Sequence, residues 1–334
     1  MFAWFFPKPI LEEADIDKGM RFLLFDGIFA QTTLVLTTGA FVIGLALALG
    51  ASNTVIGLLA AVGPVMQALQ VPAIYLVERW RKRRPLTVLA VTLSRLALVG
   101  VAFVPFTIAP SSRALAWLLG LLVCHFGLGA VAACAGNSWV RDLIPEPRME
   151  SFFARRLALA TLAGALASLL GGAGIDLYKS LFSGDALAYG LVFGAGAISG
   201  LVSVGFLSRV PEPRMPEVSP PPLLALLRQP FRDKNFRRLL IFLGWWNFAV
   251  NFAGPFFAVY LLKRLELTMT WVLVLSVLSQ LCNVMFYGAW GRLAERFTNK
   301  SVLVFCLPIF FLTFLLWPFT MFPERHILTL PILV

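Results

Sequence analysis

Three ionisable side chains lie inside long apolar stretches of the sequence: Asp26, Arg95 and His125. A charged group is costly in hydrocarbon, so such residues often mark the path of a substrate, an ion or a proton. Asp26 is a candidate proton or cation site. A solvated carboxylate near a helix start, or a pair with Arg21, is the favoured explanation for it.

The other two ionisable residues lie deeper in their stretches. Arg95 must be met by a carboxylate, a carbonyl or an anionic group of a substrate, and structural pairing is the favoured explanation. His125 is either a site for substrate or protons, or a hydrogen-bonded core residue.

Uncharged polar residues occur in pairs at helical spacing in other apolar stretches. Asn247 and Asn251 are four residues apart, and Gln280 and Asn283 are three apart, so each pair shares a helix face. An amide face is unfavourable in lipid, so we expect these faces to point inward. Hydrogen bonding between helices explains the pairs, and lining a substrate cavity together with Gln31 is the alternative.

Patterns typical of enzymes and nucleic-acid-binding proteins are missing from the sequence. We find no nucleophile paired with a base, no His, Cys and Asp residues at metal-ligand spacing and no phosphate-binding glycine loop, so we expect no enzymatic activity, no cofactor and no metal. The net charge of +11 comes from basic residues scattered among short loops rather than gathered on one domain. Nucleic acid is therefore a poor candidate partner.

The elements that carry these residues must be membrane-spanning helices. The chain is 59% hydrophobic and 13% charged, against about 45–50% and about 25% in soluble domains. Its apolar runs are continuous rather than alternating and reach at least ~18 residues, which favours helices over a barrel. We predict about nine full helices, at residues 22–49, 54–77, 86–106, 114–138, 152–177, 186–207, 239–262, 268–290 and 301–322, and the start of a tenth near Ile327.

A charged, proline-rich stretch divides these helices. "RVPEPRMPEVSPPP" begins at Arg209, and its prolines and charges exclude a membrane helix. We therefore expect an all-α membrane protein with an N-terminal arm at 1–21, a six-helix bundle at 22–207, a linker at 208–238 and a partial bundle at 239–334.

The basic residues indicate the orientation in the membrane. Of the 28 Lys and Arg residues, 22 fall in the N-terminal arm, the linker and the loops on the same side, whereas the opposite loops hold five. By the positive-inside rule, the N terminus and the linker lie in the cytoplasm.

One charged motif occurs twice in the sequence. "LVERWRKRRPL" at Leu76–Leu86 and "LAERFTNKSVL" at Leu293–Leu303 have the same offset at both ends, since 293 − 76 and 303 − 86 are both 217. The same shift lays the first predicted helix on the seventh. This indicates a duplicated six-helix unit, with repeats related by an axis along the membrane normal.

The second copy resembles a family signature. "GRLAERFTNK" at Gly291–Lys300 is similar to the loop signature G-x-L-A-D-R-x-G-R-K of the major facilitator superfamily, with Glu295 in place of the usual Asp. The matching residues are Gly291, Leu293, Ala294, Arg296 and Lys300. The first copy is a weaker match, in which Glu78 and Arg79 fit and Arg81 replaces the second glycine. "HFGLG" at His125–Gly129 resembles the R-x-x-x-G element of the same family.

The resemblance implies a bacterial secondary transporter that moves a small organic solute by alternating access between two helix bundles. We expect a monomer in the lipid bilayer of the bacterial cytoplasmic (inner) membrane, with possible proton coupling. Members have twelve helices, so we expect this chain to be a fragment or a degenerate protein. The alternative is a membrane assembly or interaction protein that uses the same fold without transport.

The repeated motif suggests a gate. A Glu–Arg pair at a helix end, such as Glu78–Arg79 or Glu295–Arg296, can bind a neighbouring helix in one packing and release it in another. The alternative is that these charges only fix the topology.

Overall fold

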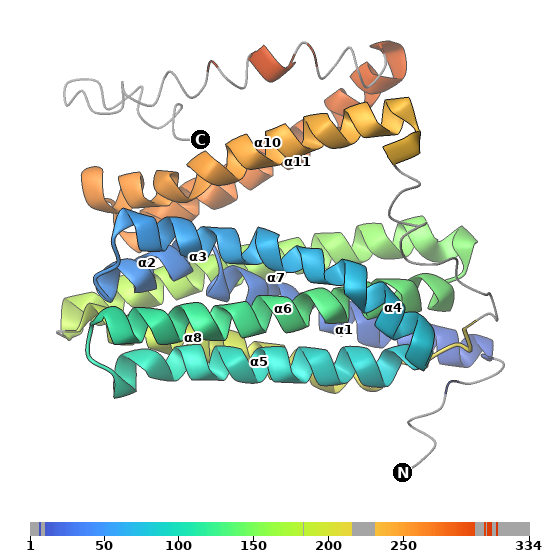
Figure 1. Cartoon of the computed structure of the whole chain (residues 1–334), viewed down its shortest axis with the longest axis horizontal. Coiled ribbons are helices and arrows are strands. Elements are labelled where there is room, and N and C mark those ends of the chain that lie inside the picture. The colour runs from blue at the N-terminus through green and yellow to red at the C-terminus, as the bar shows by residue number, and fades with distance from the viewer. Residues whose placement is uncertain are drawn as a thin grey trace. The chain divides into compact units, whose positions relative to one another are not determined.

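The computed structural model describes Pro7, residues 11–182, 184–215 and 231–297, and residues 304, 306–308 and 312. Within these residues the regular elements are all helical (Figure 1), which confirms the predicted all-α class. The chain forms two compact units, Met1–Val259 and Tyr260–Val334, which are described separately. The predicted division at the 208–238 linker stays a prediction.

The helices of the first unit account for the first seven predicted spans. Their bounds are α1 (Glu13–Thr37), α2 (Ala40–Ala48), α3 (Asn53–Met66), the 3₁₀ turn η2 (Gln67–Leu69), α4 (Gln70–Trp80), α5 (Arg83–Thr107), α6 (Ser112–Leu143), α7 (Glu146–Leu181), α8 (Asp185–Leu207) and α10 (Lys234–Val259). The second unit holds the π turn η3 (Tyr260–Arg264) and α11 (Met269–Phe297). The ninth and tenth predicted helices lie almost entirely outside the described residues.

Seven spans among the described residues are long and apolar enough to cross a membrane. They confirm a multi-pass membrane protein. The first span, Glu13–Ala48, contains both α1 and α2, and the second, Asn53–Trp80, contains α3, η2 and α4.

Two helices begin earlier than their apolar runs predicted. Helix α1 starts nine residues before position 22, and its first turn carries Glu13 and Asp15, whose carboxylates interact favourably with the positive end of the helix dipole. Helix α7 starts at Glu146, six residues before position 152, with Pro147 in its first turn, where a missing N–H costs nothing. Both helices therefore extend past the apolar segment.

The first predicted helix is broken in two. Gly39 has φ +57°, a left-handed conformation that glycine adopts without a steric penalty, and it separates α1 from α2. The hydroxyl groups of Thr37 and Thr38 donate to the carbonyl oxygens of Thr33 and Leu34, at 2.7 and 2.6 Å. These bonds satisfy backbone acceptors near the break, as a break inside hydrocarbon requires.

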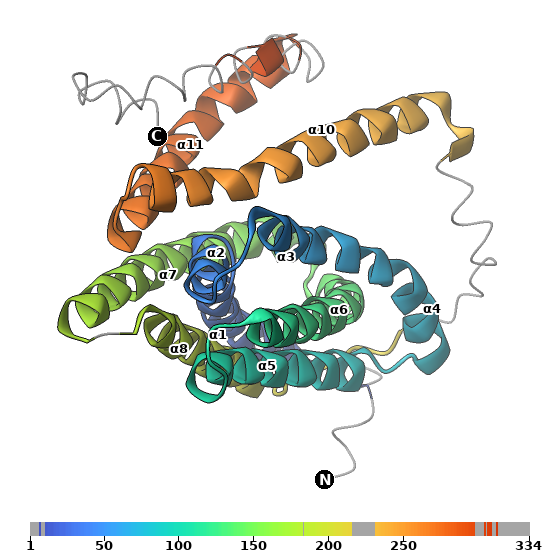
Figure 2. The same ribbon diagram turned by 60° about the vertical axis from the view of Figure 1, so that its left-hand side comes forward.

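Six membrane spans of the first unit pack into a bundle (Figure 2) in which α1 lies against α7 and α8, and α5 lies against α6 and α8. Small residues allow this close approach, as is usual between membrane helices. A Cβ at Gly171 of α7 would lie 2.8 Å from Leu36 Cδ2 and 3.0 Å from Phe41 Cζ. Leu36 and Phe41 are themselves buried, so neither has space to move away.

We expect Gly171→Leu to destabilise the bundle by about 1–3 kcal/mol, because overpacking forces neighbours out of their rotamers. Thermal unfolding of the purified protein in detergent measures this change. The matched control is Gly174→Leu on the same helix, where a Cβ would meet nothing within 4 Å. Equal unfolding temperatures for the two variants would contradict the tight packing of α7 on α1 and α2.

Candidate functional site

A buried ion pair lies inside the first bundle. Asp26 on α1 is only 6% exposed, and Arg156 on α7 donates from Nη2 to its Oδ2 at 3.0 Å. Ser203 on α8 donates to the other carboxylate oxygen at 2.7 Å. Arg156 also donates from Nε to the carbonyl oxygen of Leu23, at 3.1 Å. One carboxylate therefore joins three helices.

Glycine makes room for this pair. A Cβ at Gly27 would lie 2.8 Å from Arg156 Nε, so the guanidinium rests directly on the backbone of α1. Asp26 is thus neither a solvated carboxylate nor a partner of Arg21, the two explanations favoured by the sequence. The sequence did not reveal its partners Arg156 and Ser203. Arg156 was treated only as one of the basic loop residues that indicate the orientation in the membrane.

Arg95 lies near this pair. Its side chain crosses α8 at Gly200, where a Cβ would lie 2.5 Å from Arg95 Cδ. Its Nε is buried and has no hydrogen-bond partner among the described residues. Asp26 and His125 are both close enough to interact with its charge. Around Asp26, the described residues therefore combine two guanidinium groups with one carboxylate.

His125 is buried between α5 and α6. Its Nδ1 lies 2.8 Å from Ser94 Oγ and 3.1 Å from the Ser94 carbonyl oxygen. The Ser94 hydroxyl donates to the His125 carbonyl oxygen at 2.9 Å. Since that proton is already used, we assign the ring proton to Nδ1, which donates back to Ser94. This geometry corresponds to the interpretation of His125 as a hydrogen-bonded core residue.

Among the described residues of the first unit, Gln31, Asn247 and Asn251 form no hydrogen bond with Asp26, whose partners are Arg156 and Ser203. Gln31 packs against α7, where a Cβ at Gly164 would lie 3.1 Å from its Cγ. Asn247 and Asn251 are exposed on α10, and Gln280 is exposed on α11.

The expected inward orientation of the amide pairs stays a prediction, because α10 has no buried residue on any of its faces. Each asparagine of the α10 pair donates at 2.8 Å to a carbonyl oxygen four residues earlier in its own helix, which uses one of the two N–H donors of its side-chain amide. The side chain of Asn283 lies outside the description.

The two copies of the repeated motif end helices. Glu78 and Arg79 lie in the last turn of α4, and Arg81 ends that helix with φ +50°. This left-handed position falls where the signature has its second glycine, which adopts such angles freely. In the second copy, Gly291 and Glu295 belong to α11 rather than to a loop, and Arg296 is exposed in its last turn. Lys300 lies outside the described residues.

A second polar cluster is centred on Arg83, the first residue of α5, which is fully buried. Its Nη1 donates to the carbonyl and hydroxyl oxygens of Ser138, both at 3.0 Å, and to Asp142 Oδ2 at 2.5 Å. Its Nη2 donates to the Pro213 carbonyl oxygen at 3.1 Å. Its backbone N–H donates to Glu212 Oε1 at 2.5 Å.

Further bonds hold the segment that follows α8. Trp139 Nε1 donates to the Pro211 carbonyl oxygen at 2.9 Å, and Arg84 Nη1 donates to the Val210 carbonyl oxygen at 3.3 Å. This segment therefore crosses the ends of α5 and α6. Burial raises the pKa of the Glu212 carboxyl, although the backbone N–H groups and charges of Arg83 and Arg84 act in the opposite direction.

The structure offers no metal site in the part of the chain that it describes, since no group of three or more His, Cys, Asp or Glu side chains there could hold an ion. A family model described as Major Facilitator Superfamily matches residues 23–334. Comparison with curated proteins gave no match.

We expect Arg83→Leu to cost about 3–5 kcal/mol of stability, because it leaves Asp142 without its cation and the Ser138 and Pro213 carbonyl oxygens without their donor. The control is Arg148→Leu, which removes the exposed bridges to Glu13 and Asp17 and should cost about 0–1 kcal/mol. Unfolding in detergent separates the two variants. A small loss for both would mean that Arg83 does not hold the cluster together.

Glu212 should make stability depend on pH. Because its pKa is raised in the folded state, folding favours the protonated carboxyl, and this contribution is present at low pH and lost as the pH rises through the folded-state pKa. We therefore expect the wild type to gain stability relative to Glu212→Gln as the pH falls from about 7 toward the ordinary value of 4.5. Unfolding temperatures at several pH values test this, with the exposed Glu13→Gln as control. A gap that narrows on acidification would contradict the direction of the pKa shift.

Proposed function

The chain belongs to the major facilitator superfamily, a family of membrane transporters, and on this basis we propose that it moves a small organic solute by alternating access, driven by protons at Asp26. The observation that carries the proposal is the buried pair between Asp26 and Arg156, held by Ser203 inside the bundle.

A pair of this kind responds strongly to one proton. In a medium of low dielectric constant the attraction between the two charges is large, and protonation of Asp26 abolishes it. Arg156 is then free to meet water or a polar group of the solute. The side chain of Arg156 is 31% exposed, compared with 9% for that of Asp26. Water and solute therefore reach Arg156 before they reach Asp26.

The cluster around Arg83 has a different role in the proposal. It fixes α5, α6 and the segment after α8 to one another at one end of the bundle. A bundle fixed in this way moves as one body, which alternating access between two bundles requires. The distribution of Lys and Arg favours a cytoplasmic position for this end and for the N terminus. The bacterial inner membrane is part of the proposal because the resemblance to bacterial members of the family implies it.

A gating role for the repeated motif stays a prediction, for Glu78–Arg79 as for Glu295–Arg296. Glu78 is half-buried and Arg79 is exposed, and we assign no gating contact to either. We propose that Arg83, within the first copy of the motif, is the structural centre of that end of the bundle.

We expect gradient-driven uptake that depends on Asp26. Proteoliposomes containing the full chain are given an inward proton gradient and a low-molecular-weight extract of the source cells, and their contents are compared with those of protein-free liposomes by mass spectrometry. At least one solute should accumulate. Asp26→Asn should reduce its uptake by about tenfold or more, since tenfold corresponds to only about 1.4 kcal/mol.

Asp17→Asn is the matched control, because Asp17 forms an exposed bridge with Arg148. It should leave uptake unchanged. Solute accumulation that is the same without the proton gradient and in Asp26→Asn would refute proton coupling but not transport. Contents identical to those of protein-free liposomes would refute transport itself.

A further inference from the structure

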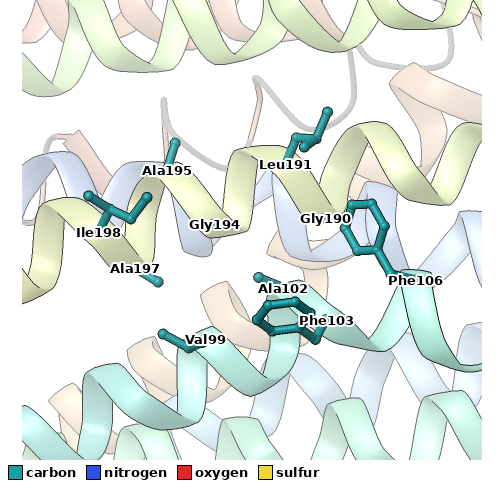
Figure 3. Close-up of a pocket in the computed structure, with 10 residues that line it drawn as sticks. All are labelled: Val99, Ala102, Phe103, Phe106, Gly190, Leu191, Gly194, Ala195, Ala197 and Ile198. Atoms are coloured by element: carbon teal, nitrogen blue, oxygen red, sulfur yellow. The ribbon is translucent and has the colours of Figure 1, made fainter.

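An apolar groove of about 490 Å³ lies between α5 and α8 (Figure 3). Val99, Ala102 and Phe103 line it from α5, and Gly194, Ala197 and Ile198 are among the residues that line it from α8. Its lining side chains carry no nitrogen or oxygen. It is therefore distinct in chemistry from the cluster around Asp26.

The groove exists because the two helices touch at its ends and part between them. At one end a Cβ on Gly190 would lie 2.9 Å from the Ala102 carbonyl oxygen, and at the other a Cβ on Gly200 would lie 2.5 Å from Arg95 Cδ. Between these contacts, a Cβ on Gly194 would meet only the Ala102 Cβ, at 3.9 Å. Small residues therefore leave a hollow that the described side chains do not fill.

The groove opens on the outside of the bundle. Phe103 is 59% exposed and Ile198 is 65% exposed, on two helices that are long and apolar enough to span a membrane. From Val99 to Phe106 the groove extends about 10 Å along α5, at 1.5 Å per residue. The apolar run of α5 begins at Leu86, so this stretch lies about 20–30 Å along it at 1.5 Å per residue. It therefore occupies the half of the ~30 Å hydrocarbon layer that is farther from Arg83.

We propose that this groove binds one acyl chain of a phospholipid from that leaflet. The layer around the groove is hydrocarbon, and an empty hollow would lose the van der Waals contacts of its walls. A chain lying in the groove touches two helices instead of one. Because lipid tails are as apolar as the lining side chains, shape and contact area rather than the hydrophobic effect retain the chain.

The alternative occupants fit the groove less well. A polar solute would find no hydrogen-bond partner among the lining side chains. One leaflet of hydrocarbon is about 15 Å deep, half of the whole layer, so a groove of about 10 Å takes up most of one chain. This inference does not depend on the proposed transport activity.

Native mass spectrometry of the full chain tests the proposal, after detergent washing that removes loosely held lipid. We expect the wild type to keep one phospholipid per chain. Gly194→Phe places a ring in the groove and should abolish this retention. Gly205→Phe, on the same helix where a Cβ meets nothing within 4 Å, should keep the lipid.

Val99→Phe fills the groove from the opposite helix, so the result does not depend on one variant folding. Loss of the phospholipid in either filling variant, with retention in Gly205→Phe, supports the proposal. Equal retention in the wild type and the filling variants would overturn it. Absence of a retained phospholipid from the wild type, or a retained molecule without a phosphate group, would overturn it as well.

Discussion

Taking a charge out of water costs several kcal/mol per ion, and the cost is recovered only when partners of good geometry surround it. In the first bundle, the Asp26–Arg156 and Arg83–Asp142 pairs meet this cost by joining different helices. The first pair connects α1 with α7, and the second connects α5 with α6. Because each pair fixes the register of two helices, the packing of the apolar residues between them depends on these contacts.

The apolar runs of the sequence were sufficient to predict the helices as far as residue 297, because the thickness of the bilayer sets their length and composition. They were not sufficient to predict the helix ends. Helix α1 extends beyond its apolar run because the carboxylates of Glu13 and Asp15 stabilise its first turn. Hydropathy alone marks only the end of the apolar run. The break at Gly39 was also missed, since a single glycine in an apolar run indicates a kink only when its φ is known.

The candidate site was predicted in part, for a physical reason. Asp26, Arg95 and His125 stood out because each is ionisable within an apolar run. Their partners did not: Arg156 lies near the end of its run, and Ser203 resembles any small polar residue of a membrane helix. Pairing depends on the rotation of one helix against another, which one sequence does not contain. The asparagines of α10 show a bond that spacing alone does not reveal, because each side-chain amide donates to a carbonyl oxygen of its own helix.

Helix α8 carries polar contacts on one face and apolar groove residues on another. Ser199 and Ser203, four residues apart, donate to the Phe29 carbonyl oxygen and to Asp26, so that face belongs to α1. Gly194 and Ile198, also four apart, lie on the groove. The helix therefore holds the buried carboxylate on one face and offers a surface to lipid on another. Ser203 and Gly194 therefore place the partner of a buried charge and the wall of an apolar groove on one helix, because a helical period of 3.6 residues separates the two faces.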